Sequence, residues 1–138
     1  MVGQGTFLGL LRLLESSIDR QQIAETKDPL ASQLKRRGAD VTIVATSFLV
    51  LEAVRAADHL APFDINCDII DLVNVSHPDT AMIIESVRKT GRLLIADTSW
   101  QAYGVAAEIC RIICEAAPSA LQEPVVTLGM AATPCPTA

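Results

Sequence analysis

Short apolar runs alternate with segments of helical period between residues 40 and 98. The runs DVTIVATS (40–47) and GRLLIADTS (91–99) are rich in Val, Ile and Leu, and each ends in hydroxyl residues. A third run, DINCDIIDLV (64–73), lies between them and continues into the polar segment NVSHPDT (74–80). Buried parallel strands alternating with covering helices produce this pattern. It predicts a three-layer α/β/α sandwich whose strand ends and helix N-termini meet at one edge, where ligands and partners usually dock.

Helical periods predict the covering layers. The segment FLVLEAVRAADHLA (48–61) places its apolar residues along one side, as a helix lying on a sheet does. Thr46 or Ser47 is expected to cap it, and Pro62 to end it. A further helix is expected from about 104 to 117, where Pro118 stops it.

The helix expected within residues 79–90 carries signals at both ends. Ser76 and Asp79 have the spacing of a capping box, and Gly91 follows as a stop signal. A last strand is expected over PVVTLGM (124–130), which completes the sheet.

The beginning of the chain has a different character. Residues 30–37 could form a short edge strand, whereas residues 1–29 read as a helix followed by a polar linker. The chain is therefore divided into 1–29 and an α/β domain over 30–138. An apolar helix outside the core must cover its own sheet or a second copy of the chain; its apolar positions are Phe7, Leu10, Leu11, Leu14 and Ile18.

Composition narrows the classes of function. A net charge of −5 argues against nucleic-acid binding, which needs a basic surface. No apolar stretch reaches the roughly 20 residues of a membrane span, and the start of the chain lacks signal-peptide features. A cytoplasmic protein with no membrane contact is expected.

The cysteines do not indicate a metal site. No CxxC pair is present and the chain has two histidines, so zinc is not expected. Cys110 and Cys114 are four residues apart on one helix face, a spacing that could hold a metal. Their apolar neighbours favour two buried core thiols instead.

Several polar residues at strand ends are candidates for chemistry, each with a plainer explanation. His77, in the loop after the third strand, could be an acid, a base or a partner contact, but no nearby motif orients it, so an exposed turn residue is favoured. Asp71 and Asp97, expected at the ends of adjacent strands, could share acid–base work or hold a cation. Aspartates at strand ends more commonly cap turns.

Trp100 and three serines complete the candidate edge. Trp100 is the chain's only tryptophan, and its large apolar surface could be covered by another subunit or buried within the domain. Ser47, Ser76 and Ser99 all precede or open helices, so capping explains them without catalysis. From the residues alone, this edge is suited to a ligand or partner and shows no catalytic motif.

Five segments in order carry a family resemblance. They resemble the C-terminal domain of the transketolase family, most closely the β subunits of thiamine-diphosphate-dependent 2-oxo acid dehydrogenases. The resemblance covers about residues 38 to 137. Its segments are DVTIVATS, IIDLVNVSHPDT, ESVRKTGRLLIADTSW, GVAAEICRIICEAA and PVVTLGMAATPCPT.

The resemblance implies a five-stranded mixed sheet in which the first strand, about 31–37, is antiparallel to the other four. It also implies that thiamine diphosphate and Mg²⁺ are held by preceding domains or partner chains, so this chain binds no cofactor or metal and is inactive alone. The implied partners are an α-type subunit or the missing thiamine-binding domains, a dihydrolipoyl acyltransferase in the dehydrogenases, and further copies of the chain. Residues 6–14 weakly resemble the last strand of the preceding domain, in conflict with the helix that their period favours.

Two hypotheses follow. The first is a non-catalytic assembly domain. The second is a stand-alone module that binds a small molecule or nucleotide at the strand-end edge, near Ser47, Ser76, His77 and Ser99. With Asp97 and Trp100, these residues form the edge expected to meet a ligand or a partner.

Overall fold

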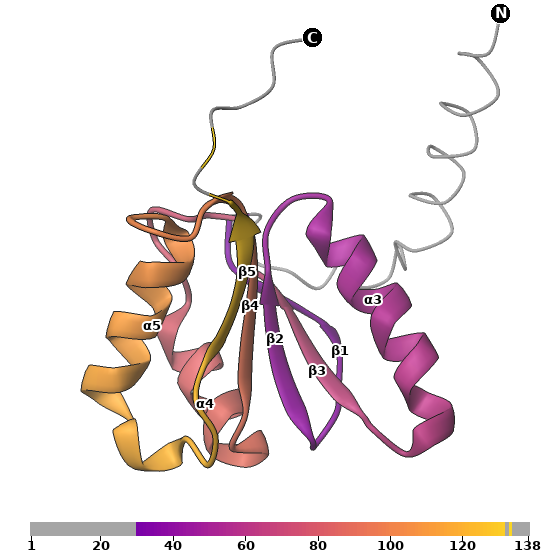
Figure 1. Ribbon diagram of the computed structural model, residues 1–138. Coiled ribbons are helices and arrows are strands. Elements are labelled where there is room, and N and C mark those ends of the chain that lie inside the picture. Colours follow the sequence, from indigo (N-terminus) through magenta and orange to yellow (C-terminus); the bar gives the residue numbers. More distant parts are fainter. Residues whose placement is uncertain (1–29, 132, 134–138) are drawn as a thin grey trace, which may run out of the picture. The chain divides into compact units, whose positions relative to one another are not determined.

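A computed structural model describes residues 30–131 and residue 133. Its elements alternate as the apolar runs predict (Figure 1). The strands are β1 (Gln33–Arg36), β2 (Val41–Ala45), β3 (Cys67–Asp71), β4 (Leu93–Trp100) and β5 (Val126–Met130). The helices are α3 (Leu49–Leu60), α4 (Thr80–Thr90) and α5 (Val105–Ala116), with short 3-10 turns at Ala61–Phe63 and Pro118–Ala120. The predicted helix at residues 6–18 lies outside the described residues.

The five strands form one mixed sheet in the order β1-β3-β2-β4-β5. β1 is antiparallel to β3, whereas β2, β3, β4 and β5 are parallel to one another. This arrangement confirms the α/β class and the antiparallel edge strand. β1 and β5 are the two edges of the sheet.

Helices cover the two faces unequally. Figure 1 shows α3 on one face, and α4 and α5 on the other. The core under α4 and α5 contains Val44, Ile70 and Ile95, and the core under α3 contains Ile43 and Ile69. Alternate residues of each strand thus enter opposite cores, because successive side chains of a strand point to opposite faces.

The caps of the helices differ from the predicted ones. Asp79, not Ser76, caps α4: its carboxylate accepts a hydrogen bond of 3.0 Å from the Met82 amide. The Ser76 hydroxyl instead donates to Asn74 Oδ1 at 2.8 Å, because an Asn side chain competes locally for such donors. Gly91 ends α4 at φ 70°, a backbone conformation that glycine adopts without steric cost.

The predicted cap of α3 is also wrong. α3 begins after Phe48 without a side-chain cap, and the carbonyls of Thr46 and Ser47 accept from the amides of Leu49 and Val50. The Thr46 hydroxyl is not free for capping because it bonds across the sheet, as described below.

The expectation that Asp71 and Asp97 end adjacent strands is wrong as well. β2 lies between β3 and β4: Ala45 is in register with Asp71 on one side and with Ala96 on the other. The crossover through α4 carries the chain past β2 and separates the two carboxylates.

One of the two predicted core thiols faces solvent. The buried face of α5 consists of Ala106, Ile109 and Ile113. Cys110 is only partly buried and Cys114 is exposed, because the buried stripe passes beside them. None of the helices in the described part of the chain is long and apolar enough to cross a membrane.

Candidate functional site

The sheet has a topological switch point between β2 and β4. From the carboxyl end of β2 the chain enters α3 on one face, and from the end of β4 it enters α5 on the other (Figure 1). In open α/β sheets, ligands bind in the crevice that opens where neighbouring connections diverge in this way. Ser47 and Ser99 lie in the two segments that border this crevice.

Asp97 fills the crevice from within. Its side chain is 5% exposed, and its Oδ1 accepts a hydrogen bond of 3.1 Å from the Thr46 hydroxyl. Its Oδ2 accepts from the Ser99 hydroxyl. Burial opposes ionisation of this carboxyl, but the hydrogen bonds from the Ser99 side chain and backbone, Thr46 and the Thr98 backbone outweigh it and lower the pKa of Asp97.

The N-terminus of α5 is packed against the same group. A Cβ atom built on Gly104, the cap residue of α5, would overlap Ser99 Oγ and the Trp100 carbonyl oxygen, and would lie 3.3 Å from Asp97 Oδ2. Glycine is thus required for this close approach. An ionised carboxylate from the chain itself lies beside the helix N-terminus, where an anionic ligand would otherwise bind.

Strained backbone marks all three loops at the carboxyl edge. Ser47, Val73 and Tyr103, which follow β2, β3 and β4, have φ values of 54°, 46° and 60°. Such conformations cost of the order of 1–3 kcal/mol outside glycine and cluster at functional sites. Asp64, which precedes β3 at the other end of the strands, also has a positive φ of 62°, so such conformations are not confined to this edge.

Apolar side chains gather near the carboxyl ends of β4 and β5. A shallow hollow of about 380 Å³ runs between the start of α3 and β5, with Leu49, Ala96, Asp97, Thr98 and Gly129 among its lining residues. We call the apolar set beside it the β5 corner, which consists of the exposed residues Phe48, Trp100, Val126 and Leu128 and the partly buried Met130.

Trp100 is the last residue of strand β4. Ala96 is the last residue of β4 that pairs with β2. β4 continues beyond it, and Trp100 is in register with Met130 of β5. Trp100 is 53% exposed within the described residues, so the domain does not bury it.

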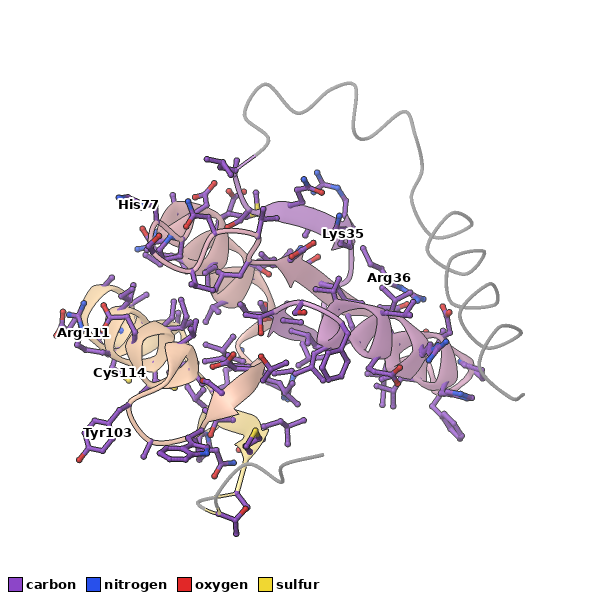
Figure 2. All side chains as sticks on the ribbon, turned by 90° about the horizontal axis from the view of Figure 1, so that it is seen from above. Lys35, Arg36, His77, Tyr103, Arg111 and Cys114 are labelled. Atoms are coloured by element: carbon purple, nitrogen blue, oxygen red, sulfur yellow. The ribbon has the colours of Figure 1, made fainter. Side chains whose placement is uncertain are left out.

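Ser76 and His77 are not part of this constellation. Both are exposed in the loop between β3 and α4. Figure 2 looks onto the carboxyl edge and shows His77 beside α4, well separated from Tyr103 beside α5. The structure thus brings Asp97 and Ser99 together with Thr46, and leaves His77 apart.

A second polar cluster, which the sequence reasoning missed, lies under α4. Asp68 is buried in β3 and accepts from Ser86 Oγ at 2.6 Å and from the Gly38 amide at 2.7 Å, with Lys89 Nζ at 2.5 Å. Burial opposes its ionisation, but the bonds from Lys89, Ser86 and Gly38 prevail and lower the pKa of Asp68. The signal in the sequence is a carboxylate near the start of a buried strand, between Cys67 and Ile69.

This cluster continues into the sheet through hydroxyl groups. Thr42 Oγ1 is 2.7 Å from Ser86 Oγ and 2.8 Å from Thr90 Oγ1. An open hollow of about 720 Å³ lies above it between β1 and α4, lined by both signs of charge, including Arg37, Asp79, Glu85 and Lys89. The cluster ties α4 to β2 and β3. Among the described residues, no group of three or more His, Cys, Asp or Glu side chains could hold a metal ion.

Curated relatives carry a consistent name. The chain is 37% identical to the pyruvate dehydrogenase E1 component subunit beta of Rickettsia felis over 117 residues, which are 83% of this chain and 36% of that protein. It is 39% identical to the mitochondrial subunit beta-1 of Arabidopsis thaliana over 76% of this chain and 29% of that protein. The Bacillus subtilis subunit beta is 32% identical over 89% of this chain and 38% of that protein. The chain thus spans about a third of the length of these relatives.

A solved structure and a family model agree with these names. The structure, described as "Split gene transketolase, inactive beta4 tetramer", is similar with a TM-score of 0.67 and 27% identity, over 74% of this chain and 33% of that one. The model of the transketolase C-terminal domain matches residues 31–138. The resemblance seen in the sequence is confirmed, and the chain belongs to the transketolase C-terminal domain family.

Proposed function

We propose that this chain is a non-catalytic assembly domain, which holds together the subunits of a thiamine-diphosphate-dependent 2-oxo acid dehydrogenase or of a transketolase-like enzyme. The observation that carries the proposal is the presence of the chain's own carboxylate in the crevice at the switch point. Asp97 occupies it, while uncharged apolar side chains stand exposed beside it. A surface of this kind suits a protein partner better than a polar ligand.

The residues of the crevice do not suit a diphosphate. A diphosphate needs unpaired amide donors or cations, whereas the N-terminus of α5 meets the Asp97 carboxylate, whose lowered pKa keeps it ionised at neutral pH. In our proposal thiamine diphosphate and Mg²⁺ are therefore held by other domains or chains. The isolated chain is inactive.

The proposed partners are an α-type subunit or the thiamine-binding domains, further copies of this chain and, in a dehydrogenase, a dihydrolipoyl acyltransferase. The names of the curated relatives, which are subunits of E1 components, support an assembly of several chains. A cytoplasmic location is part of the proposal, although several curated relatives have mitochondrial names.

Calorimetry tests the cofactor half of the proposal. Thiamine diphosphate with Mg²⁺ is titrated into the full chain, with a complete E1 enzyme of α and β subunits as the positive control. We expect no binding heat from the chain alone. Micromolar binding without partner chains would overturn the non-catalytic assignment.

Mixing experiments test the assembly half. The purified chain is combined with a purified α-type E1 subunit and followed by sedimentation velocity, with Asp58→Asn on the exposed face of α3 as the control variant. We expect a faster-sedimenting complex with both forms. If the α-type subunit and the chain always sediment separately, and the chain also forms no oligomer, the assembly role is wrong.

A further inference from the structure

The face of the sheet that carries α3 is covered only in part. α3 packs on β2 and β3, and its buried residues Ala53 and Ala57 lie over that half of the sheet. On the same face, Leu94 and Ala96 of β4 are in register with Val126 and Leu128 of β5. These two β5 side chains have no helix above them among the described elements, and both are about half exposed.

Aromatic side chains extend this apolar surface toward the carboxyl edge. Phe48 is 65% exposed at the start of α3, across the hollow from Leu128 and Met130. Trp100 continues it beside Met130. Aromatic residues are enriched at protein interfaces because they bury a large area at little cost in side-chain entropy.

Charge is missing from every segment that builds the β5 corner. Residues 41–51, 98–107 and 124–131 contain no Asp, Glu, Lys or Arg, although the whole chain has a net charge of −5. Asp97, the charged residue that lines the hollow, is buried and hydrogen-bonded. A charged partner would therefore find no charge to pair with at this surface.

We propose that the β5 corner is the surface through which the chain pairs with a second copy of itself, an inference that rests on the proposed assembly function. A neutral patch is self-complementary under a two-fold axis, since two copies bury it without bringing like charges together. β5 adds a sheet edge with no strand beyond it, whose backbone groups can pair with the same edge of the second copy. Phe48 and Trp100 are the anchors of this contact.

Trp100 is a built-in probe of this contact, because it is the chain's only tryptophan. The full chain is diluted from about 500 to about 1 µM, a range that brackets a weak dimer, while acrylamide quenching of its fluorescence and sedimentation equilibrium are recorded. We expect Trp100 to be shielded in the dimer and to become accessible as the dimer dissociates. Leu128→Glu and Phe48→Glu should be monomeric throughout, with quenching that does not change on dilution.

Phe63→Glu is the matched control. Phe63 is 76% exposed in the 3-10 turn between α3 and β3, at the amino end of the strands and away from the β5 corner, so a glutamate there should leave dimerisation unchanged. Circular dichroism confirms that each variant is folded. Because Phe48 lies outside the strands, Phe48→Glu remains informative if Leu128→Glu disturbs β5.

The outcomes separate this inference from the proposed function. A dimer that survives both Leu128→Glu and Phe48→Glu, or that Phe63→Glu disrupts equally, would show that the β5 corner is not the dimer surface. Self-association through another surface would remain. A wild-type chain that is monomeric with a shielded Trp100 would indicate cover by its own chain and overturn pairing with a second copy. Micromolar cofactor binding would overturn the proposed function alone.

Discussion

The Thr46 hydroxyl donates a hydrogen bond of 3.1 Å to Asp97 Oδ1, joining the carboxyl ends of β2 and β4 inside the sheet edge. Both side chains are buried, and Ser99 donates to the other carboxylate oxygen. A buried carboxylate is stable only when such donors replace its water. The bond explains why this switch point is occupied by the chain itself.

Removing the Thr46 hydroxyl should destabilise the domain. Thr46→Val keeps the shape of the side chain but leaves Asp97 Oδ1 without this donor, which costs about 1–3 kcal/mol in the free energy of unfolding. Urea denaturation measures the change. Thr46→Ser, which keeps the hydroxyl, is the control, and equal stability of the two variants would contradict the role given to the bond.

Asp68 should matter more than an exposed aspartate. Asp68→Asn removes the charge that Lys89 pairs with and turns an acceptor toward Ser86 into a donor, so a loss of about 2 kcal/mol is expected. Asp58, which pairs with Arg36 at 2.6 Å, is 67% exposed, and Asp58→Asn should cost less than about 1 kcal/mol. Thermal unfolding of both variants compares the losses in stability. Similar losses for Asp68→Asn and Asp58→Asn would contradict the greater importance of Asp68.

Stability should fall with acid. The pKa values of Asp68 and Asp97 are lowered in the folded chain, so the unfolded chain binds protons more readily at these groups. Their contribution is complete above the unfolded pKa of about 4 and is lost as pH falls through the folded values. Melting temperatures between about pH 6 and pH 2.5 should drop steeply at the acid end.

Asp97→Asn serves as the control for the acid loss. This variant should be less stable at neutral pH, and it should show a shallower dependence on pH because one of the two buried aspartates with a lowered pKa is gone. A slope equal to that of the wild type would exclude Asp97 as a source of the acid loss.

Gly104→Ala should disturb the start of α5. The added methyl group would overlap Ser99 Oγ and the Trp100 carbonyl oxygen, and overpacking of this kind costs about 1–3 kcal/mol. Gly104→Ala should also destabilise the Ser99→Ala variant, but by less than it destabilises the wild type. The Ser99 hydroxyl is then gone, whereas the Trp100 carbonyl still obstructs the methyl group. If denaturant titrations show that Gly104→Ala has no effect on the stability of Ser99→Ala, the Trp100 carbonyl does not obstruct the methyl group.

The period of the apolar residues was enough to predict the helices and strands of the described region. Runs such as 40–47 and 91–99 carry the β-branched and aliphatic residues of buried strands, and each is followed by a helix of the right period. The strand order could not be read in this way. Local patterns do not say whether the strand after α4 pairs with β3 or lies on the far side of β2. In the structure β4 lies beyond β2, which separates Asp71 from Asp97.

Side-chain hydrogen bonds were the hardest to predict. Ser76, Asp79 and Thr46 are all residue types that cap helices, but only Asp79 does so in the structure. The Ser76 hydroxyl donates to Asn74 instead, and the Thr46 hydroxyl donates to Asp97. Of the candidate edge, Asp97, Ser99 and Trp100 prove to be close neighbours in the structure. The composition of the β5 corner was visible in the sequence, but its exposure depends on the uneven cover by α3.

The two edges of the sheet differ in a way that limits how far copies of the chain could polymerise. β1 carries Lys35 and Arg36 along its edge (Figure 2), and a register irregularity between Leu34 and Arg36 interrupts its pairing with β3. Charge and a bulge both discourage a further strand from adding there. In the dimer that we propose, growth through β5 therefore ends once two copies have met, and β1 disfavours extension of the sheet from its other side.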